Sequence, residues 1–329
     1  MYYYKDFRAE NIKQKKIILI GGSNSLLGIN SETIEEKTGY PVSNLSTHAA
    51  LDISFLYYKI KQHINDGDIV VLPLEFEYYS RNSEISDWFS TNMMAWGNDY
   101  LKQLSINDLF IFFIIAEPSE VFKGAKRQLK NNSVNKKLLS KQTVLTNLNL
   151  LWESNGEKWR GYSYKSLNKF GDINADETIS YTNDNIYLQK ELKISSHFLN
   201  FYKKIEKLIE QHHGSLYLTY PVTIRNELFN LSNKETQERM TLFEKSLAEH
   251  KINIQCNAAL FNLEREFFFD THYHTNKYGA IIRSDTLAFC LNKLTNKNIT
   301  KTSYSKAISM VNTLQNRYMD KVKKPENSD

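Results

Sequence analysis

The sequence predicts an α/β fold, in which helices cover a doubly wound parallel sheet. Three observations predict it: short apolar runs rich in β-branched residues, helical segments that alternate with them, and polar or glycine-containing turns at their ends. Continuous apolar runs are typical of strands buried on both faces, and their alternation with helices is typical of βαβ units. We therefore expect a three-layer, flavodoxin-like sheet that carries a large insertion.

The first 80 residues contain three expected strands. The run at 17–20 ends in Gly21-Gly22, and further strands are expected at 41–45 and 69–74. Helices are expected between them over 31–37, with Ser31 as a candidate N-cap, and over 51–64. The alternation resumes late in the chain with these expected elements: helix 192–210, strand 216–220, helix 234–249, a last strand near 252–255 and helix 279–293.

These elements divide the chain into four parts. Residues 1–79 and 191–300 are the two halves of one α/β domain, 80–190 is an insertion or cap, and 301–329 is a polar tail. Within the insertion, the apolar run Leu109–Ala116 is interpreted as a buried helix. The basic stretch from Lys123 to Lys141 is interpreted as a solvated helical face, with peripheral membrane contact as the alternative.

Composition excludes several classes of protein. Among 329 residues, 42 Lys and Arg against 37 Asp and Glu give a net charge of +5, too small an excess to indicate nucleic-acid binding. Two cysteines exclude a disulfide framework and a four-cysteine zinc site; we expect both to be reduced in a core, with a single disulfide as the alternative. Residues 1–6 show no signal-peptide pattern and no apolar run could span a bilayer, which predicts a cytoplasmic protein.

Two segments contain candidate catalytic residues. Ser23 follows Gly21-Gly22 at the turn after the first expected strand, where open α/β sheets bind ligands. Near the other end of the chain, residues 270–279 read DTHYHTNKYG. In that segment a carboxylate could orient an imidazole, which would then take a proton from a serine during acyl transfer.

These residues resemble the SGNH/GDSL family of serine esterases and acyltransferases. The segment GGSNSLLG at 21–28 is similar to the first motif of that family, with Gly22 where an aspartate is usual, and 270–279 is similar to the last. The resemblance implies Ser23 as the nucleophile, His274 as the base and Asp270 as its acid, with His272 as an alternative base. It also implies backbone amides of Ser23 and Ala49 as the oxyanion donors. The third motif of the family is absent, and Glu75 stands in its place.

The resemblance implies an O-acetyl esterase or a polysaccharide O-acetyltransferase that acts on a carbohydrate. No cofactor is expected, although a transferase would use acetyl-CoA as a co-substrate. Glu75, Trp159 and Tyr162 are the expected substrate contacts, and the two aromatic rings would suit stacking on a sugar.

Two alternatives remain open at this point. The first is an inactive protein of this fold that binds a glycan or serves as a scaffold. The second is a zinc site in which Asp270, His272 and His274 are joined by His212 or His213. His48 is expected to be a packed or surface residue.

Overall fold

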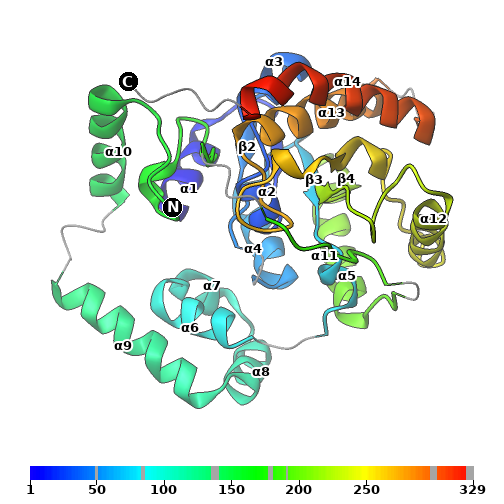
Figure 1. The fold of residues 1–329 in the computed structure, drawn as a ribbon. Helices are drawn as coiled ribbons and strands as arrows, with labels where there is room; N and C mark the ends of the chain where they lie inside the picture. Colours follow the sequence, from blue (N-terminus) through cyan, green and yellow to red (C-terminus); the bar gives the residue numbers. More distant parts are fainter. Residues whose placement is uncertain are drawn as a thin grey trace.

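The centre of the molecule is a four-stranded, all-parallel sheet. The computed structural model describes residues 1–48, 51–82, 86–134, 141–176, 181–189, 192–296 and 302–323. The strands lie in the order β2-β1-β3-β4 (Figure 1) and are β1 (Ile17–Leu19), β2 (Val42–Asn44), β3 (Ile69–Pro73) and β4 (Ser215–Thr219). In register, Ile17 lies between Val42 and Ile69. The α/β prediction and its parallel sheet are confirmed.

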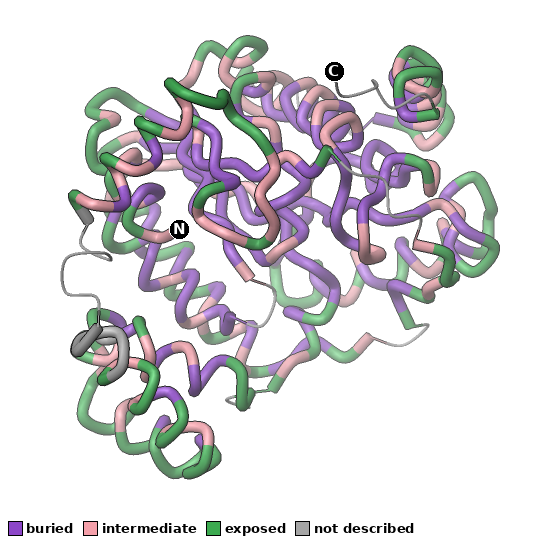
Figure 2. Tube along the Cα trace, turned by 60° about the vertical axis from the view of Figure 1, so that its left-hand side comes forward, coloured by how far each residue is buried: buried purple, intermediate pink, exposed green. Residues whose placement is uncertain are grey.

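Helices pack on the sheet in two groups. The helices of the α/β core are α1 (Tyr2–Asn11), α2 (Ser23–Leu26), α3 (Ser31–Thr38), α4 (Ile53–His63), α5 (Glu77–Ser80), α11 (Ser196–Gln211), α12 (Lys234–Ala248), α13 (Lys277–Thr295) and α14 (Tyr304–Lys323). Helix α3 packs against α13, and α4 packs against α11. From β1 the chain crosses through α3 to β2 in one direction along the sheet, and from β2 it crosses through α4 to β3 in the opposite direction. Because such crossovers are right-handed, α3 and α4 lie on opposite faces of the sheet. Figure 2 shows the buried trace concentrated at the centre of the molecule.

The region expected as an insertion attaches to the core at two separate places. Its helices are α6 (Asp87–Trp96), α7 (Asn98–Gln103), α8 (Ile106–Ile115), α9 (Pro118–Val134) and α10 (Lys141–Asn155). A small core that includes Phe55 of α4, Phe89 and Phe112 holds α6–α8. A second core that includes Leu26, Leu148 and Phe269 holds α10 and the segment after it against the α2 turn.

The second attachment depends on one buried carboxylate. Asp172 accepts hydrogen bonds from the Ser31 amide (2.6 Å) and hydroxyl (2.9 Å), and from Asn44 Nδ2 (2.8 Å). Ser31, the first residue of α3, is therefore bonded to Asp172 through both its amide and its hydroxyl. Asn30, rather than the expected Ser31, caps the helix by accepting from the Thr33 amide.

Two expectations about the secondary structure of the second half of the chain are corrected. The expected polar tail contains the 20-residue helix α14, which buries Ala307, Val311 and Leu314 against the core. The expected strand near 252–255 is a single parallel bridge between Ile254 and Leu218. Short elements complete this half: β5 (Thr223–Ile224), β6 (Asn262–Leu263), and 3-10 turns at Tyr164–Ser166, Ala258–Phe261 and Arg265–Phe267.

The two cysteines form a disulfide rather than the expected reduced pair. Cys256 and Cys290 of α13 are bonded, with their Cα atoms 5.8 Å apart. Disulfides persist in oxidising compartments and are rare in the cytosol. In the part of the chain that the structure describes, no helix has the length and apolarity needed to cross a membrane.

Candidate active site

The turn that carries Ser23 lies at the carboxyl edge of the sheet. Strand β1 ends at Leu19, Gly22 serves as the N-cap of α2 in an extended conformation, and Ser23 is the first helical residue. The backbone amides of Ser25 and Leu26 both donate to the Gly22 carbonyl, at 3.1 and 3.2 Å, and these two bonds form the first turn of α2. The half-buried Ser23 side chain therefore stands where a strand gives way to a helix.

Two buried charged side chains hold this turn by its backbone at Asn24. Glu75 follows β3, and its Oε1 accepts from the Asn24 amide at 3.0 Å. Arg283 of α13 donates through Nη1 to the Asn24 carbonyl at 2.6 Å. The glycine at 28 permits this contact, because a Cβ there would lie 2.5 Å from Arg283 Nη1. The residue after Ser23 is thus fixed from both sides.

The loop from 268 to 276 folds back on itself and presents the acid and the base together. Phe268 and Thr275 form an antiparallel bridge, and the Phe269 amide donates to the His274 carbonyl at 2.8 Å. Within this loop, Nδ1 of His274 lies 2.9 Å from Oδ1 of Asp270. The four-residue spacing between Asp270 and His274 is therefore compatible with pairing.

Asn276 and Gly279 of the same motif are structural. The Asn276 side chain caps α13 by accepting from the amides of Tyr278 (3.1 Å) and Gly279 (3.0 Å). A side chain at Gly279 would collide with the carbonyl oxygen of Phe267. Both residues fix the point at which the loop enters α13.

The two segments that are far apart in the sequence meet directly. Asn24 Nδ2 donates to the carbonyls of Val222 (3.1 Å) and Tyr273 (3.4 Å), and the Thr275 hydroxyl donates to the Leu27 carbonyl (3.1 Å). The neighbours of Ser23 in sequence therefore contact the neighbours of His274. Among the described residues, no hydrogen bond joins the Ser23 hydroxyl to the His274 imidazole.

Tyr162, from the segment after α10, completes the acid–base pair. Its hydroxyl donates to Oδ2 of Asp270 and lies 2.9 Å from Nδ1 of His274. Burial alone would raise the pKa of Asp270, but the hydrogen bonds from His274 and Tyr162 hold that pKa below its usual value. The carboxylate is therefore ionised at neutral pH, and Nε2 of His274 has no hydrogen-bond partner among the described residues. Trp159 packs edge-on against Phe269 and Tyr162, so it stands beside the pair.

His272 faces a different environment. Its ring packs against Tyr181, Tyr187 and Tyr273, and burial lowers its pKa. It makes no hydrogen bond to Asp270 in the described structure. Of the two candidate bases, the structure pairs only His274 with the acid.

His212 and His213, the further ligands in the zinc alternative, lie away from Asp270, His272 and His274. His212 and His213 follow α11, and the His212 carbonyl accepts from Gly67, just before β3 begins. Those histidines lie at the amino edge of the sheet, opposite the site. Within the described ranges, no three His, Cys, Asp or Glu side chains are grouped closely enough to hold a metal ion.

Glu75, expected to contact substrate, is buried in this structure, and the expected contact stays a prediction. Its side chain is only 2% exposed, and one of its oxygens is bonded to the backbone of the serine turn. Ala49, the other expected oxyanion donor, lies outside the described residues. Burial lowers the pKa of His48 to about 4, and the nearby charge of His274 contributes to this shift in the same direction. Sequence reasoning missed this proximity.

The ionisation of Glu75 gives a testable pH dependence. Burial raises its pKa from 4.5 to about 7, and its Oε2 has no hydrogen-bond partner. The folded protein therefore holds a proton that the unfolded chain has already released, so this group destabilises the fold as the pH rises from about 4.5 to about 7. We expect Glu75→Gln, which keeps the acceptor for the Asn24 amide, to gain about 3 kcal/mol in unfolding free energy relative to wild type across that range. Urea unfolding at pH 5 and pH 8 measures this difference. An equal gain at both pH values would contradict the assignment, and Glu227→Gln, in the loop after β5, is a control.

Comparison with known proteins adds no relative. The chain matches no family model, and no curated protein matches its sequence. The resemblance to SGNH enzymes therefore depends on the residues described above.

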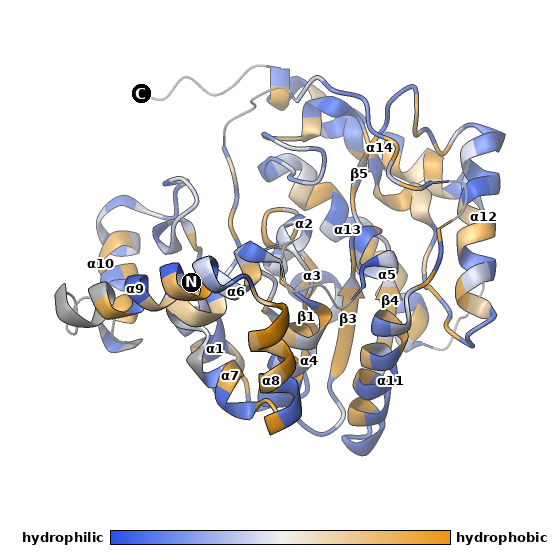
Figure 3. Ribbon diagram, turned by 90° about the horizontal axis from the view of Figure 1, so that it is seen from below, coloured by the Kyte–Doolittle hydropathy of each residue, from blue (hydrophilic) through white to orange (hydrophobic). Residues whose placement is uncertain are grey.

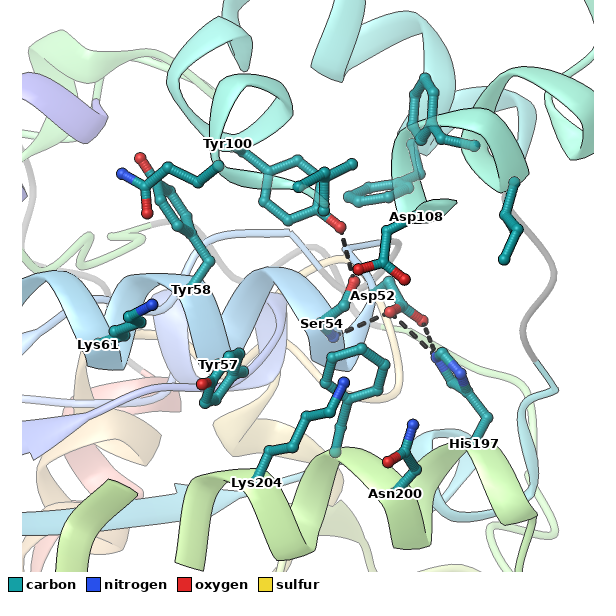
Figure 4. A pocket seen from close by; sticks show the side chains of 16 residues that line it. Asp52, Ser54, Tyr57, Tyr58, Lys61, Tyr100, Asp108, His197, Asn200 and Lys204 are labelled. Atoms are coloured by element: carbon teal, nitrogen blue, oxygen red, sulfur yellow. Dashed lines mark hydrogen bonds and ion pairs between the residues drawn. The ribbon is translucent and has the colours of Figure 1, made fainter. Parts of the chain in front are cut away.

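A separate cavity of about 320 Å³ lies between α4, α11 and the α7–α8 region. Figure 4 shows six of its polar residues: Asp52, Ser54, Tyr100, Asp108, His197 and Lys204. His197 Nε2 bonds both oxygens of Asp52 (2.9 and 3.1 Å), and Asp52 caps α4 through the Ser54 amide (2.8 Å). The pair therefore ties α4 to α11. Sequence reasoning missed this cavity because its walls come from distant helices.

Proposed function

We propose that the chain is an SGNH-like serine enzyme that transfers an acyl group from an ester, with a three-layer, flavodoxin-like fold of that family. The observation that supports this most is the Asp270–His274 pair, bonded at 2.9 Å, beside the turn that carries Ser23. The expected substrate is an O-acylated carbohydrate, and the reaction is that of an O-acetyl esterase or a polysaccharide O-acetyltransferase.

In the proposed reaction, Ser23 Oγ attacks the ester carbonyl carbon while Nε2 of His274 takes its proton. Asp270 and Tyr162 hold Nδ1, so the imidazole keeps the tautomer in which Nε2 is the base. The tetrahedral intermediate collapses by breaking its bond to the leaving group. That group, an alcohol or, where acetyl-CoA is the donor, the thiol of coenzyme A, takes the proton back from His274. Water, or a sugar hydroxyl in a transferase, then attacks the acyl-serine with His274 again as the base.

Two backbone amides are the proposed oxyanion donors. The Ser23 amide donates no hydrogen bond within the described structure, so it is free to donate to the developing oxyanion. The Asn24 amide is not free, because Glu75 accepts from it. The Ala49 amide remains the second proposed donor.

One feature of the site supports a carbohydrate substrate. Trp159 and Tyr162 form an aromatic wall beside the acid–base pair, which suits stacking on a sugar ring. A transferase would take its acetyl group from acetyl-CoA. A cytoplasmic location remains a prediction, and the Cys256–Cys290 disulfide argues against it.

Ester hydrolysis by Ser23→Ala tests the proposal. We expect a p-nitrophenyl acetate series to show a loss of at least about 10³-fold in kcat/KM relative to wild type. Ser246→Ala, on the exposed face of α12, is the matched control and should retain full activity. Equal rates for wild type and Ser23→Ala would contradict a nucleophilic role. Mass spectrometry of oligosaccharides incubated with acetyl-CoA distinguishes a transferase from an esterase.

An inactive glycan-binding or scaffold protein is the second candidate. Two observations favour it: in the described part of the structure the Ser23 and His274 side chains share no hydrogen bond, and Glu75 stands in place of the third family motif. Glycan binding that survives in Ser23→Ala, without turnover by wild type, would support this candidate.

A further inference from the structure

Helix α8 exposes an unusual amount of apolar side chain. The sequence predicts a buried helix here, but Ile106, Phe110 and Ile114 are 87%, 67% and 65% exposed. Ile111, Phe113 and Ile115 are exposed as well, whereas Phe112 anchors the helix in the core that holds α6–α8. Figure 3 shows α8 as the most hydrophobic helix at its edge of the molecule. A contiguous exposed apolar surface of this kind marks an interaction site.

The geometry of this surface favours a fluid apolar medium over a protein groove. At about 100° per residue, the six exposed apolar residues of α8 cover an arc of about 200° around the helix. A helix that packs on another protein element typically uses an apolar stripe of about 100°. Hydrocarbon, in contrast, can surround a helix over the wider arc.

Helix α9, which follows directly, adds positive charge to the same end of the molecule (Figure 1). It packs against α6 at Gly124, where a Cβ would lie 2.5 Å from the Thr91 carbonyl. Phe122 and Leu129, on the opposite face, are 72% and 69% exposed. At about 100° per residue, the exposed cations Lys126, Lys123 and Arg127 follow this apolar strip around one side of the helix, with Lys126 nearest the strip and Arg127 nearest the Gly124 face. Lys123 also bonds Glu120 at 3.1 Å. An exposed apolar strip flanked by cations is typical of a helix that lies in an anionic membrane interface.

We propose that α8 and α9 form a surface that docks this protein on an anionic lipid bilayer. The apolar side chains of α8 enter the interface, and the cations of α9 contact lipid phosphates. A second copy of the chain fits the surface less well. A symmetric dimer through α8 would bring two cationic α9 helices toward each other, and like charges oppose that association.

Vesicle co-sedimentation tests the proposal. Wild type should sediment with phosphatidylcholine vesicles containing one quarter phosphatidylglycerol, and at least about tenfold less with phosphatidylcholine alone. Phe110→Asp/Ile114→Asp should lose binding at least about tenfold, and Lys126→Glu/Arg127→Glu should lose it only on the anionic vesicles. Leu242→Asp, which changes a similarly exposed leucine on α12, should bind as wild type does. Circular dichroism should show all variants folded, because the changed side chains are exposed.

A second measurement keeps the test independent of variant folding. Phe110→Trp keeps the apolar character, and brominated lipids should quench its fluorescence if α8 enters the bilayer. Equal sedimentation of wild type and Phe110→Asp/Ile114→Asp would overturn the proposal. A second outcome would also overturn it: wild type does not bind vesicles but forms a concentration-dependent dimer, and the double variant does not dimerise. That result would assign the surface to a second copy of the chain. Neither result depends on the activity proposed for Ser23.

Discussion

His274→Ala is expected to lower kcat/KM for ester hydrolysis by at least about 10⁴-fold, because a triad that loses its base loses most of its rate acceleration. The physical reason is that Nδ1 of His274 is held by Asp270 at 2.9 Å, so Nε2 is the imidazole nitrogen available to a nucleophile. Asp270→Asn should lose a similar factor, since an amide in place of the carboxylate would favour the wrong tautomer. Initial rates on p-nitrophenyl acetate measure both variants.

His272→Ala is the matched control for this prediction. The two histidines lie in one loop, but His272 packs among tyrosines and does not bond Asp270. We expect its removal to cost less than about tenfold in kcat/KM, through changed packing of the loop alone. A larger loss in His272→Ala than in His274→Ala would reassign the base and contradict the pairing.

The sequence predicted those parts of the fold that depend on local patterns. Strand β1 followed from four consecutive apolar residues that end in two glycines, and β3 from a similar run at 69–74. The meeting of the Ser23 turn with the His274 loop could be predicted as well. Parallel strands bring their carboxyl ends to one edge, and the loop precedes a helix that packs on that sheet.

Features that depend on distant partners could not be predicted. Nothing within residues 301–329 indicates that α14 finds an apolar surface on the 3-10 turn at 258–261. The bond between Glu75 and the serine turn could not be predicted, because its partner Asn24 lies 51 residues earlier and donates through a backbone amide. The apolar run of α8 was interpreted as buried for the same reason: hydrophobicity alone does not show which surface, if any, covers a helix.

Arg283→Met is expected to destabilise the fold by about 2 to 3 kcal/mol, the usual cost of leaving a buried carbonyl without the charged group that donates to it. Arg283 is 1% exposed, and its charged hydrogen bond satisfies the buried carbonyl of Asn24 at 2.6 Å. Burial lowers the pKa of Arg283 to about 9, and the Glu75 carboxylate opposes that shift, so the guanidinium stays charged at neutral pH. Methionine fills part of the volume but leaves the carbonyl without a donor. Urea unfolding at pH 7 measures the loss.

Arg239→Met on α12 is the control, because Arg239 bonds Glu235 in an exposed i, i+4 pair whose loss should cost less than about 0.5 kcal/mol. The comparison also tests how the serine turn is held. If Arg283 fixes the turn through Asn24, then Arg283→Met should lower kcat for ester hydrolysis even at temperatures where the variant is fully folded, since Ser23 directly precedes Asn24. Loss of stability with an unchanged kcat would show that α13 braces the core without positioning the nucleophile. A loss of stability no larger than that of Arg239→Met would show that the buried guanidinium does not hold the turn at all.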